Sequence, residues 1–412
     1  MSKILITSIG TGIKKDGGYR SAEYEIEGKR YKEKIIAKAL YNHVRFDKIF
    51  MLGTSKSMWD AVYEAFGGKD ENMWCKLSGN QETGKIEERD LLPITALWMD
   101  DFNMAGSKTF IVNYGLDDSQ LWGNFETYLK IAEYIEDGDE IYLDITHSFR
   151  SLSLMSYIML DFVKSMRQKE FTVEAIFYGM FEYIYEPSNV GKITPVVNLK
   201  ILFEINEWIK AISAFKNYGR AELIVENLDK RFGKGDEKTK YFSRFSENIS
   251  IANLSAIKAY VDRVKDKLSL FDETGFPIMK LVSKDLIDFI KRMDKKYLSD
   301  FQLEVAAWFC ENKNYAVSYI ALTESVVSKI CEMEGIGMES EKDRKEAKKR
   351  LHSEMKYASL SKKYKTLNQV RNSVAHQLSD RRGSIISDIK NLKKSIDNIE
   401  KEFKKLDKSG HS

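Results

Sequence analysis

The sequence is poor in the residues that cross-link a chain or interrupt its helices. It contains three cysteines (Cys75, Cys310 and Cys331), five histidines and four prolines among 412 residues. The cysteines form no CxxC pair and have no histidine partners at zinc spacing, which argues against a disulfide framework and a structural zinc site. We therefore expect no bound metal. Scarce proline favours long, uninterrupted helices.

Long apolar runs and a large charge excess are also lacking. The longest apolar candidate, residues 152–163, contains Asp161 and is shorter than the run of about 18 residues that a membrane-spanning helix needs. The apolar N-terminal stretch is only about five residues long and leads into Gly-Thr-Gly, unlike a signal peptide. The net charge is +3, so any nucleic acid is expected to bind at a local site. We expect a cytoplasmic protein with no membrane partner.

The chain does contain enough apolar sequence for two or three folded domains. Hydrophobic residues make up 43% of it and charged residues 31%, which excludes wholesale disorder. In residues 1–195, short apolar runs alternate with amphipathic segments, a pattern typical of βαβ units in a mostly parallel, Rossmann-like sheet. Strands are expected at residues 4–9, 49–52, 109–114, 140–145 and 172–177, a small hairpin around Gly28, and a polar loop at 68–90.

Helical spacing replaces this alternation after Pro195, so residues 196–412 are expected to form an all-α bundle. Near the C-terminus the apolar residues repeat at alternating intervals of four and three, which is the a/d seam of a heptad pattern. The seam comprises Ile385, Ile389, Leu392, Ile396, Ile399, Phe403 and Leu406. Such a seam fits either a dimerisation helix or one long helix packed on its own bundle, and the sequence leaves both open.

Small and polar residues directly follow four of the expected strands. They are Gly10-Thr11-Gly12, Gly53-Thr54-Ser55, Asn113-Tyr114-Gly115 and Asp144-Ile145-Thr146-His147-Ser148. In parallel sheets, ligands bind beyond the carboxyl ends of the strands, and helix N-termini at that edge favour phosphate. The same residue types are also ordinary turn and cap residues, so a purely structural role stays open. A GxG without its third glycine gives no reason to expect NAD.

A second pattern, Arg371-Asn372-Ser373-Val374-Ala375-His376, lies near the end of the helical half. Arginine offers a permanent cation and a planar fork for phosphate, and histidine exchanges a proton near neutral pH. Together they suit metal-free RNA cleavage, in which a 2′-hydroxyl attacks the adjacent phosphate. At about 100° per residue the two side chains lie about 140° apart around a regular helix, so an ordinary helix surface is the competing interpretation.

Taken together, the two motifs resemble those of the CRISPR-associated ribonucleases that join a CARF sensor domain to a HEPN effector domain, the accessory effectors of type III systems. Asp144-Ile145-Thr146-His147-Ser148, followed by Phe149-Arg150, is similar to the family's D-x-T-H-G motif and its Phe-Arg, with Ser148 in place of the frequent glycine. The segment 371–376 matches the HEPN form R-N-x-x-x-H. The order of an α/β half followed by a helical half also fits.

The resemblance implies a CARF sensor in residues 1–195 and a HEPN ribonuclease in residues 196–412. A homodimer, with higher oligomers left open, would bind a cyclic oligoadenylate and cleave single-stranded RNA without metal or other cofactor, leaving a 2′,3′-cyclic phosphate. Tetra-adenylate is the first expectation for the ring and hexa-adenylate the second. Ligand-binding residues would be Gly10, Thr11, Gly12, Thr54, Ser55, Thr146, His147 and Ser148, and catalytic residues Arg371, Asn372 and His376.

Two alternatives stay open. In the first, the protein is a nucleotide-sensing module whose helical half only binds a partner, because a sensor needs the strand-end residues but not the Arg–His pair. In the second it is a DNA-binding regulator, against which the near-balanced charge and the lack of an obvious basic recognition helix count.

Overall fold

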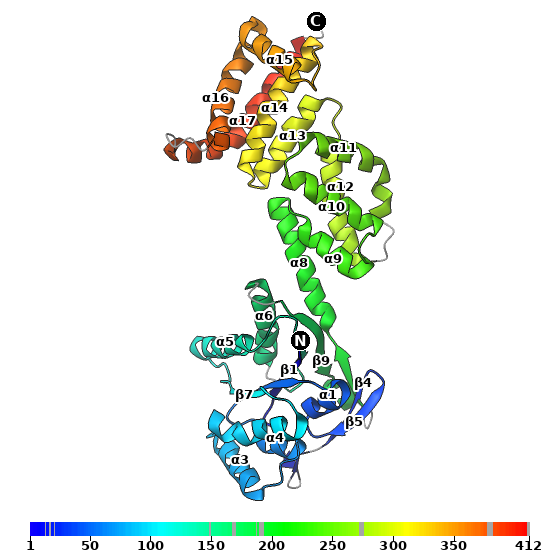
Figure 1. Ribbon diagram of the computed structural model, residues 1–412, viewed down its shortest axis with the longest axis vertical. Coiled ribbons are helices and arrows are strands. Elements are labelled where there is room, and N and C mark those ends of the chain that lie inside the picture. Colours follow the sequence, from blue (N-terminus) through cyan, green and yellow to red (C-terminus); the bar gives the residue numbers. More distant parts are fainter. Residues whose placement is uncertain are drawn as a thin grey trace. The chain divides into compact units, whose positions relative to one another are not determined.

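The computed structural model describes residues 1–12, 14–15, 18–19, 21–147, 150–166, 170–186, 188, 193–271, 276–376 and 382–409. The chain divides into two compact units, Met1–Glu204 (unit 1) and Ile205–Ser412 (unit 2) (Figure 1). Each unit has its own hydrophobic core.

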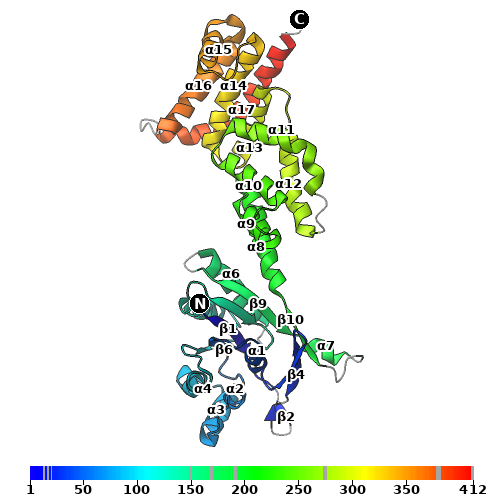
Figure 2. The same cartoon turned by 45° about the vertical axis from the view of Figure 1, so that its right-hand side comes forward.

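Unit 1 is built on one eight-stranded sheet. Its strands, in spatial order, are β5 (Lys29–Glu33), β4 (Ala22–Ile26), β10 (Thr194–Asn198), β9 (Thr172–Gly179), β8 (Glu140–Asp144), β1 (Lys3–Ile9), β6 (Lys48–Gly53) and β7 (Lys108–Ile111). The five strands from β9 to β7 are parallel, whereas β10 runs antiparallel to β9 (Figure 2). A separate short hairpin pairs β2 (Lys14–Lys15) with β3 (Gly18–Tyr19).

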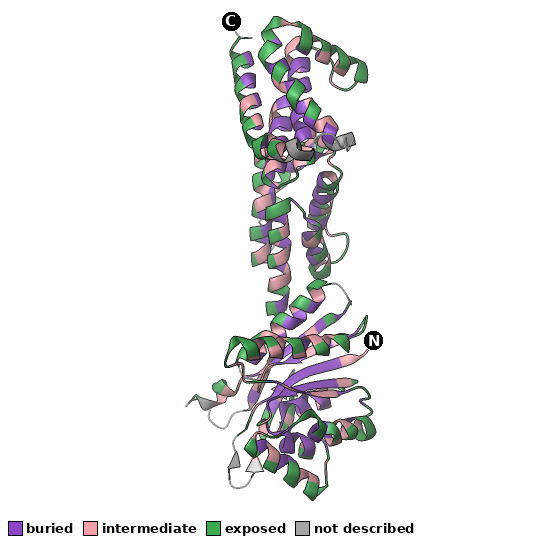
Figure 3. Cartoon of the chain, turned by 90° about the vertical axis from the view of Figure 1, so that its left-hand side faces the viewer, coloured by how far each residue is buried: buried purple, intermediate pink, exposed green. Residues whose placement is uncertain are grey.

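Helices cover both faces of this sheet because alternate strand residues point to opposite sides. Ile4, Ile6 and Phe50 pack beneath α5 and α6, whereas Leu5 and Ile49 pack beneath α1 to α4. The strands are buried and the outer faces of the helices are exposed (Figure 3). The helices are α1 (Ile36–Val44), α2 (Trp59–Ala65), α3 (Glu71–Thr83), η1 (Glu88–Leu91), α4 (Leu92–Phe102), α5 (Asp118–Glu133), α6 (Arg150–Met166) and α7 (Phe181–Tyr185).

The predicted fold class is confirmed, since a mostly parallel α/β sheet precedes an all-helical unit. Three expectations need correction. The boundary after residue 195 falls inside β10, and the compact units divide at residue 204 instead. The strand β10 was not expected at all. The expected loop at 68–90 contains α3, whose N-terminus is capped by the Asp70 carboxylate.

Unit 2 consists of helices around a single core. They are α8 (Lys200–Tyr218, which crosses the boundary), α9 (Glu222–Phe232), α10 (Glu237–Ser250), α11 (Leu254–Val264), η3 (Lys265–Phe271), α12 (Pro277–Met293), α13 (Leu298–Glu311), α14 (Tyr315–Glu334), α15 (Glu341–Ser353), η4 (Met355–Tyr357), α16 (Ala358–His376) and α17 (Arg382–Ser409). The α17 seam from Leu392 to Leu406 is buried in this core. The long helix therefore packs on its own bundle, as one of the two interpretations predicted.

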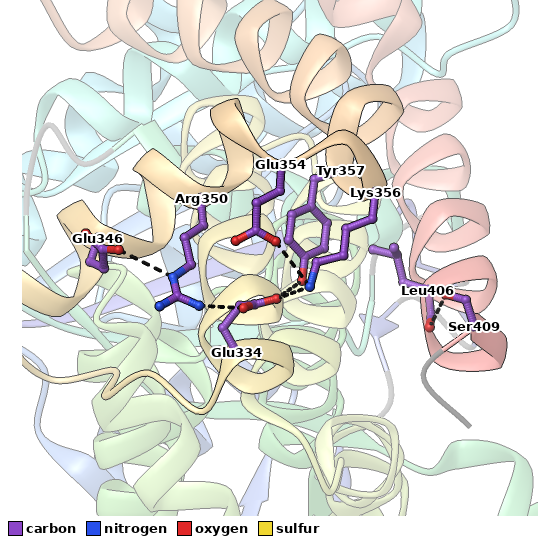
Figure 4. Close-up of polar contacts among 8 residues, drawn as sticks. All are labelled: Glu334, Glu346, Arg350, Glu354, Lys356, Tyr357, Leu406 and Ser409. Carbon is purple, nitrogen blue, oxygen red and sulfur yellow. Dashed lines mark hydrogen bonds and ion pairs between the residues drawn. The ribbon is translucent and has the colours of Figure 1, made fainter. Parts of the chain in front are cut away.

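A carboxylate at the end of α14 fixes the start of α16. Glu334 accepts hydrogen bonds from Arg350 Nη1 at 2.6 Å and from the Tyr357 hydroxyl at 2.6 Å, and it also pairs with Lys356 (Figure 4). These partners lower the pKa of Glu334 to about 2. The cluster joins α14, α15 and η4, and η4 leads directly into α16.

Candidate functional site

A buried carboxylate organises the carboxyl end of β8. Asp144 is only 1% exposed, and it accepts hydrogen bonds from the Thr7 hydroxyl of β1 at 2.6 Å and from the Thr146 amide at 3.0 Å. Burial raises the pKa of this carboxyl, although its hydrogen bonds oppose the rise. The side chain therefore joins two neighbouring strand ends and shapes the loop that follows β8.

Thr146 extends this connection to the next strand. Its hydroxyl oxygen accepts a hydrogen bond from the Gly179 amide, at the end of β9, at 2.9 Å. A Cβ on Gly179 would lie 2.9 Å from the Thr146 methyl carbon, closer than side chains normally approach. The contact thus needs glycine at position 179, and the ends of β1, β8 and β9 are held together.

His147 lies between the loop and aromatic side chains. Its Nε2 is 3.4 Å from the Tyr24 hydroxyl, and its ring centroid is 5.2 Å from that of Phe181. Burial of the ring lowers the pKa of His147 to about 4, although the residue as a whole keeps some exposed surface. The imidazole is therefore neutral at physiological pH, and it offers hydrogen bonds without adding positive charge.

Gly10 allows the β1 loop to approach the His147 backbone. A Cβ at position 10 would lie 2.8 Å from the His147 carbonyl oxygen, so a side chain would force the two loops apart. Gly12 has a φ of +62°, and a Cβ there would lie 2.6 Å from the Tyr19 ring. Thr11, between these glycines, is exposed.

The β6 loop closes the other side of this edge. The Thr54 amide and the Ile9 carbonyl both bond the Ser57 hydroxyl, at 2.9 Å each, and the Met58 amide donates to the Gly10 carbonyl at 3.0 Å. Thr54 is buried and its hydroxyl serves this loop, whereas Ser55 keeps exposed surface. Thr54 is thus a positioning residue rather than a surface contact.

The structure therefore brings most of the expected residues to one edge of the sheet, which we call the rim: Gly10, Thr11, Gly12, Thr54, Ser55, Thr146 and His147. Ser148 lies outside the described residues. Sequence reasoning missed Tyr19, Tyr24 and Phe181, which line the rim from distant segments and carry no local motif.

The second motif ends α16. Arg371 Nη1 donates a hydrogen bond to the Asn372 side-chain oxygen at 3.1 Å, and both residues are partly exposed. Ser373 turns inward, and its hydroxyl bonds the Gln369 carbonyl of the preceding turn. His376 is the last residue of α16, and its side chain lies outside the described residues. Asn372 thus orients the partly exposed guanidinium of Arg371.

The described residues also bear on the type of site. They contain no group of three histidine, cysteine, aspartate or glutamate side chains placed to hold a metal ion. No helix in this described part of the chain is long and apolar enough to cross a bilayer.

Comparison with known proteins agrees with the α/β domain. Residues 4–182 match the family model of the CARF domain of the CRISPR system endoribonuclease Csx1, so unit 1 contains a CARF domain. Residues 204–300 match the model of the second domain of CRISPR-associated protein MJ1674. The chain belongs to the CRISPR-associated proteins that contain a CARF domain.

Individual relatives show how far this likeness extends. The CRISPR-associated protein MJ1674 of Methanocaldococcus jannaschii is 31% identical over 439 residues, an alignment that covers 96% of this chain. The chain spans 66% of the length of that relative. The solved structure of Enterococcus italicus Csm6 bound to cyclic hexa-2′-fluoro-hexa-dAMP is similar with a TM-score of 0.41 and 13% identity, over 100% of this chain and 99% of that one.

Proposed function

We propose that this protein is an endoribonuclease of CRISPR type III antiviral defence, activated by a cyclic oligoadenylate and independent of metal. The observation that carries the proposal is the rim, where Asp144 and Thr146 hold three strand ends together within the CARF-matched residues. Its backbone amides, hydroxyls and close-approach glycines suit a ligand made of phosphates, riboses and bases.

The rim residues divide into groups that would contact the ring and groups that hold them in place. Thr11, Ser55 and His147 have exposed surface and would contact the ligand, together with Thr146 and Ser148. Gly10 and Gly12 would let the ring approach the backbone, and buried Thr54 would shape the β6 loop. Since the neutral His147 brings no charge, backbone amides would carry most of the phosphate recognition. Tetra-adenylate remains the first candidate and hexa-adenylate the second.

The end of α16 would supply the ribonuclease chemistry. The RNA 2′-hydroxyl would lose its proton and attack the adjacent phosphorus, and the 5′-oxygen would leave with a proton, which produces a 2′,3′-cyclic phosphate. Arg371 would stabilise the charge on the phosphate oxygens, and Asn372 would orient its guanidinium. His376 would hold or transfer a proton. The sites of two copies would combine into one.

An exposed apolar stripe on α6 supports a homodimer of the CARF domain. Leu154 (61% exposed), Ile158 and Phe162 follow one another at intervals of four residues on one helix face. Phe162 also packs against Phe125 of α5, with ring centroids 5.5 Å apart. An apolar stripe of this kind is typical of a surface that a partner covers.

The test is cleavage of a fluorescent single-stranded RNA in EDTA, with and without cyclic tri-, tetra- and hexa-adenylate. We expect one ring to stimulate cleavage. Arg371→Ala and His376→Ala should abolish cleavage and leave ring binding intact, whereas Lys362→Ala, which removes an exposed cation from the same helix, should cleave normally.

Two results would contradict this proposal. Cleavage by purified Arg371→Ala and His376→Ala would refute the assignment of the catalytic residues. If none of the three rings stimulates cleavage although ring binding is measurable, the protein would instead be a sensor whose helical domain binds a partner.

A further inference from the structure

A basic hollow opens on the surface of unit 2, far along the sequence from both motifs. Its volume is about 410 Å³, and four cations line it: Lys240, Arg244, Arg263 and Lys267. Glu237 is the one carboxylate in this lining, which leaves a formal excess of three positive charges. That local excess equals the net charge of the whole chain, so the hollow is a marked concentration of positive charge.

The cations form two rows on helices that are fixed to each other. Lys240 and Arg244 are one turn apart on α10, and Arg263 and Lys267 are four residues apart across the junction of α11 and η3, where the backbone of Lys267 is not helical. The buried Tyr260 of α11 donates a hydrogen bond to the Tyr241 carbonyl of α10 at 3.1 Å. The two walls are therefore held in register before any ligand arrives.

Among the described residues, no carboxylate pairs with the cations of this hollow, in contrast to Arg292 of the same unit. Arg292, which lines another hollow of unit 2, pairs with Glu311 through Nη1 and Nη2 and with Glu304 through Nε. In the part of the chain that the structure describes, none of the four cations of the basic hollow has an ion-pair partner. Like charges one turn apart, such as Lys240 and Arg244, destabilise a helix, so the α10 row in particular favours a bound polyanion.

We propose that this hollow binds the phosphodiester backbone of single-stranded RNA as a docking site separate from the cleavage residues. Two rows of exposed cations suit successive phosphates, and arginine adds a planar fork for each phosphate that it contacts. Such a site binds RNA without reading its sequence, because its contacts are to phosphate. The choice of RNA as the polyanion rests on the proposed function. The site would hold the substrate strand while a neighbouring segment is cleaved.

The test is the affinity of the full chain for a fluorescent single-stranded RNA without activator, measured by anisotropy over a salt series. The variants are Lys240→Gln/Arg244→Gln on one wall and Arg263→Gln/Lys267→Gln on the other. The matched control is Lys280→Gln/Lys291→Gln, which removes two exposed cations from α12. Circular dichroism and thermal melting confirm that every variant is folded.

The plot of log K against log salt has a negative slope, and each lost phosphate contact on a single strand makes it about 0.7 less steep. Either wall variant loses two contacts, so its slope should be about 1.4 less steep than that of the wild type. At about 0.1 M salt the same loss makes binding about 25-fold weaker. The control should bind like the wild type. Unchanged affinity and slope in both wall variants would overturn the proposal, and so would an equal loss in the control.

Two further arms separate the alternatives. If inorganic phosphate protects the hollow from lysine acetylation while the wall variants bind RNA normally, the ligand is a free phosphate and the RNA site is refuted. Because binding is measured without cleavage, weaker RNA binding by the wall variants supports the docking site even if the wild type proves not to be a nuclease. If the wall variants bind RNA normally and still cleave it, the docking site is refuted and the proposed nuclease function is not.

Discussion

Replacing Glu334 with glutamine tests whether its ion-pair cluster holds the helix that carries Arg371. The substitution keeps the size of the side chain and removes its charge. A carboxyl whose pKa falls from 4.5 to about 2 on folding contributes about 3 kcal/mol to the free energy of unfolding at neutral pH. Lys356 is half exposed, so solvent screening reduces this to about 2 kcal/mol.

The predicted loss should appear in thermal unfolding followed by tryptophan fluorescence. For a unit of this length, about 2 kcal/mol corresponds to a Tm about 4–8 °C lower for Glu334→Gln at pH 7. Because folding depresses the pKa, the stabilisation is fully present above the unfolded value near 4.5 and is lost as the pH falls towards 2. The wild type and the variant should therefore converge in acid.

The matched control is Glu346→Gln, which removes an exposed carboxylate that also pairs with Arg350. An exposed pair of this kind contributes about 0.3–0.5 kcal/mol, so its Tm should fall by no more than about 2 °C. The reasoning is refuted if Glu334→Gln costs no more than this control at pH 7. It is also refuted if the difference between Glu334→Gln and the wild type stays constant down to pH 3.

Three further predictions concern unit 1. Asp144→Ala leaves the buried Thr7 hydroxyl and the partly buried Thr146 amide without their acceptor, so calorimetry should show activator affinity falling about tenfold or more, and equal affinity would contradict the role of the carboxylate. Gly10→Ala places a Cβ 2.8 Å from a facing carbonyl oxygen and should weaken the same binding, whereas Gly79→Ala, whose Cβ meets open space, should not. Ile158→Glu should shift sedimentation from dimer to monomer, and Leu281→Glu, on an exposed apolar residue of unit 2, should not.

The strands of the parallel sheet were predictable because strands buried on both faces appear as continuous apolar runs. Residues 4–9 and 140–145 are of this kind, and the structure places β1 and β8 there. In contrast, β10 is short and begins with Thr194-Pro195, and it pairs with β4 about 170 residues earlier. It also pairs with β9, but only Thr194 of its five residues is buried, so β10 has no continuous apolar run. The helix α3 was missed because few of its residues are buried.

The rim was predictable for a different reason. The carboxyl ends of parallel strands share one edge, so residues that follow separate strands must come together there. The sequence did not indicate what each side chain does at that edge. The Thr54 hydroxyl bonds within its own loop, to the Ser57 hydroxyl. Burial lowers the pKa of His147, which packs next to Phe181 of a helix distant in the sequence. Roles of this kind depend on tertiary neighbours that no motif contains.

In the proposed function the ring binds the rim of unit 1 and Arg371 of unit 2 cleaves RNA, so activation is a shift of population between two states. A hundredfold activation requires the ring to bind the competent state about 2.7 kcal/mol more tightly than the other state. A ring that binds both states equally tightly does not shift the population between them. A rim substitution such as Asp144→Ala that weakens binding to both states equally therefore raises the ring concentration needed, and a saturating ring still restores the full rate. Loss of Arg371 removes the reaction itself, so no ring concentration restores it.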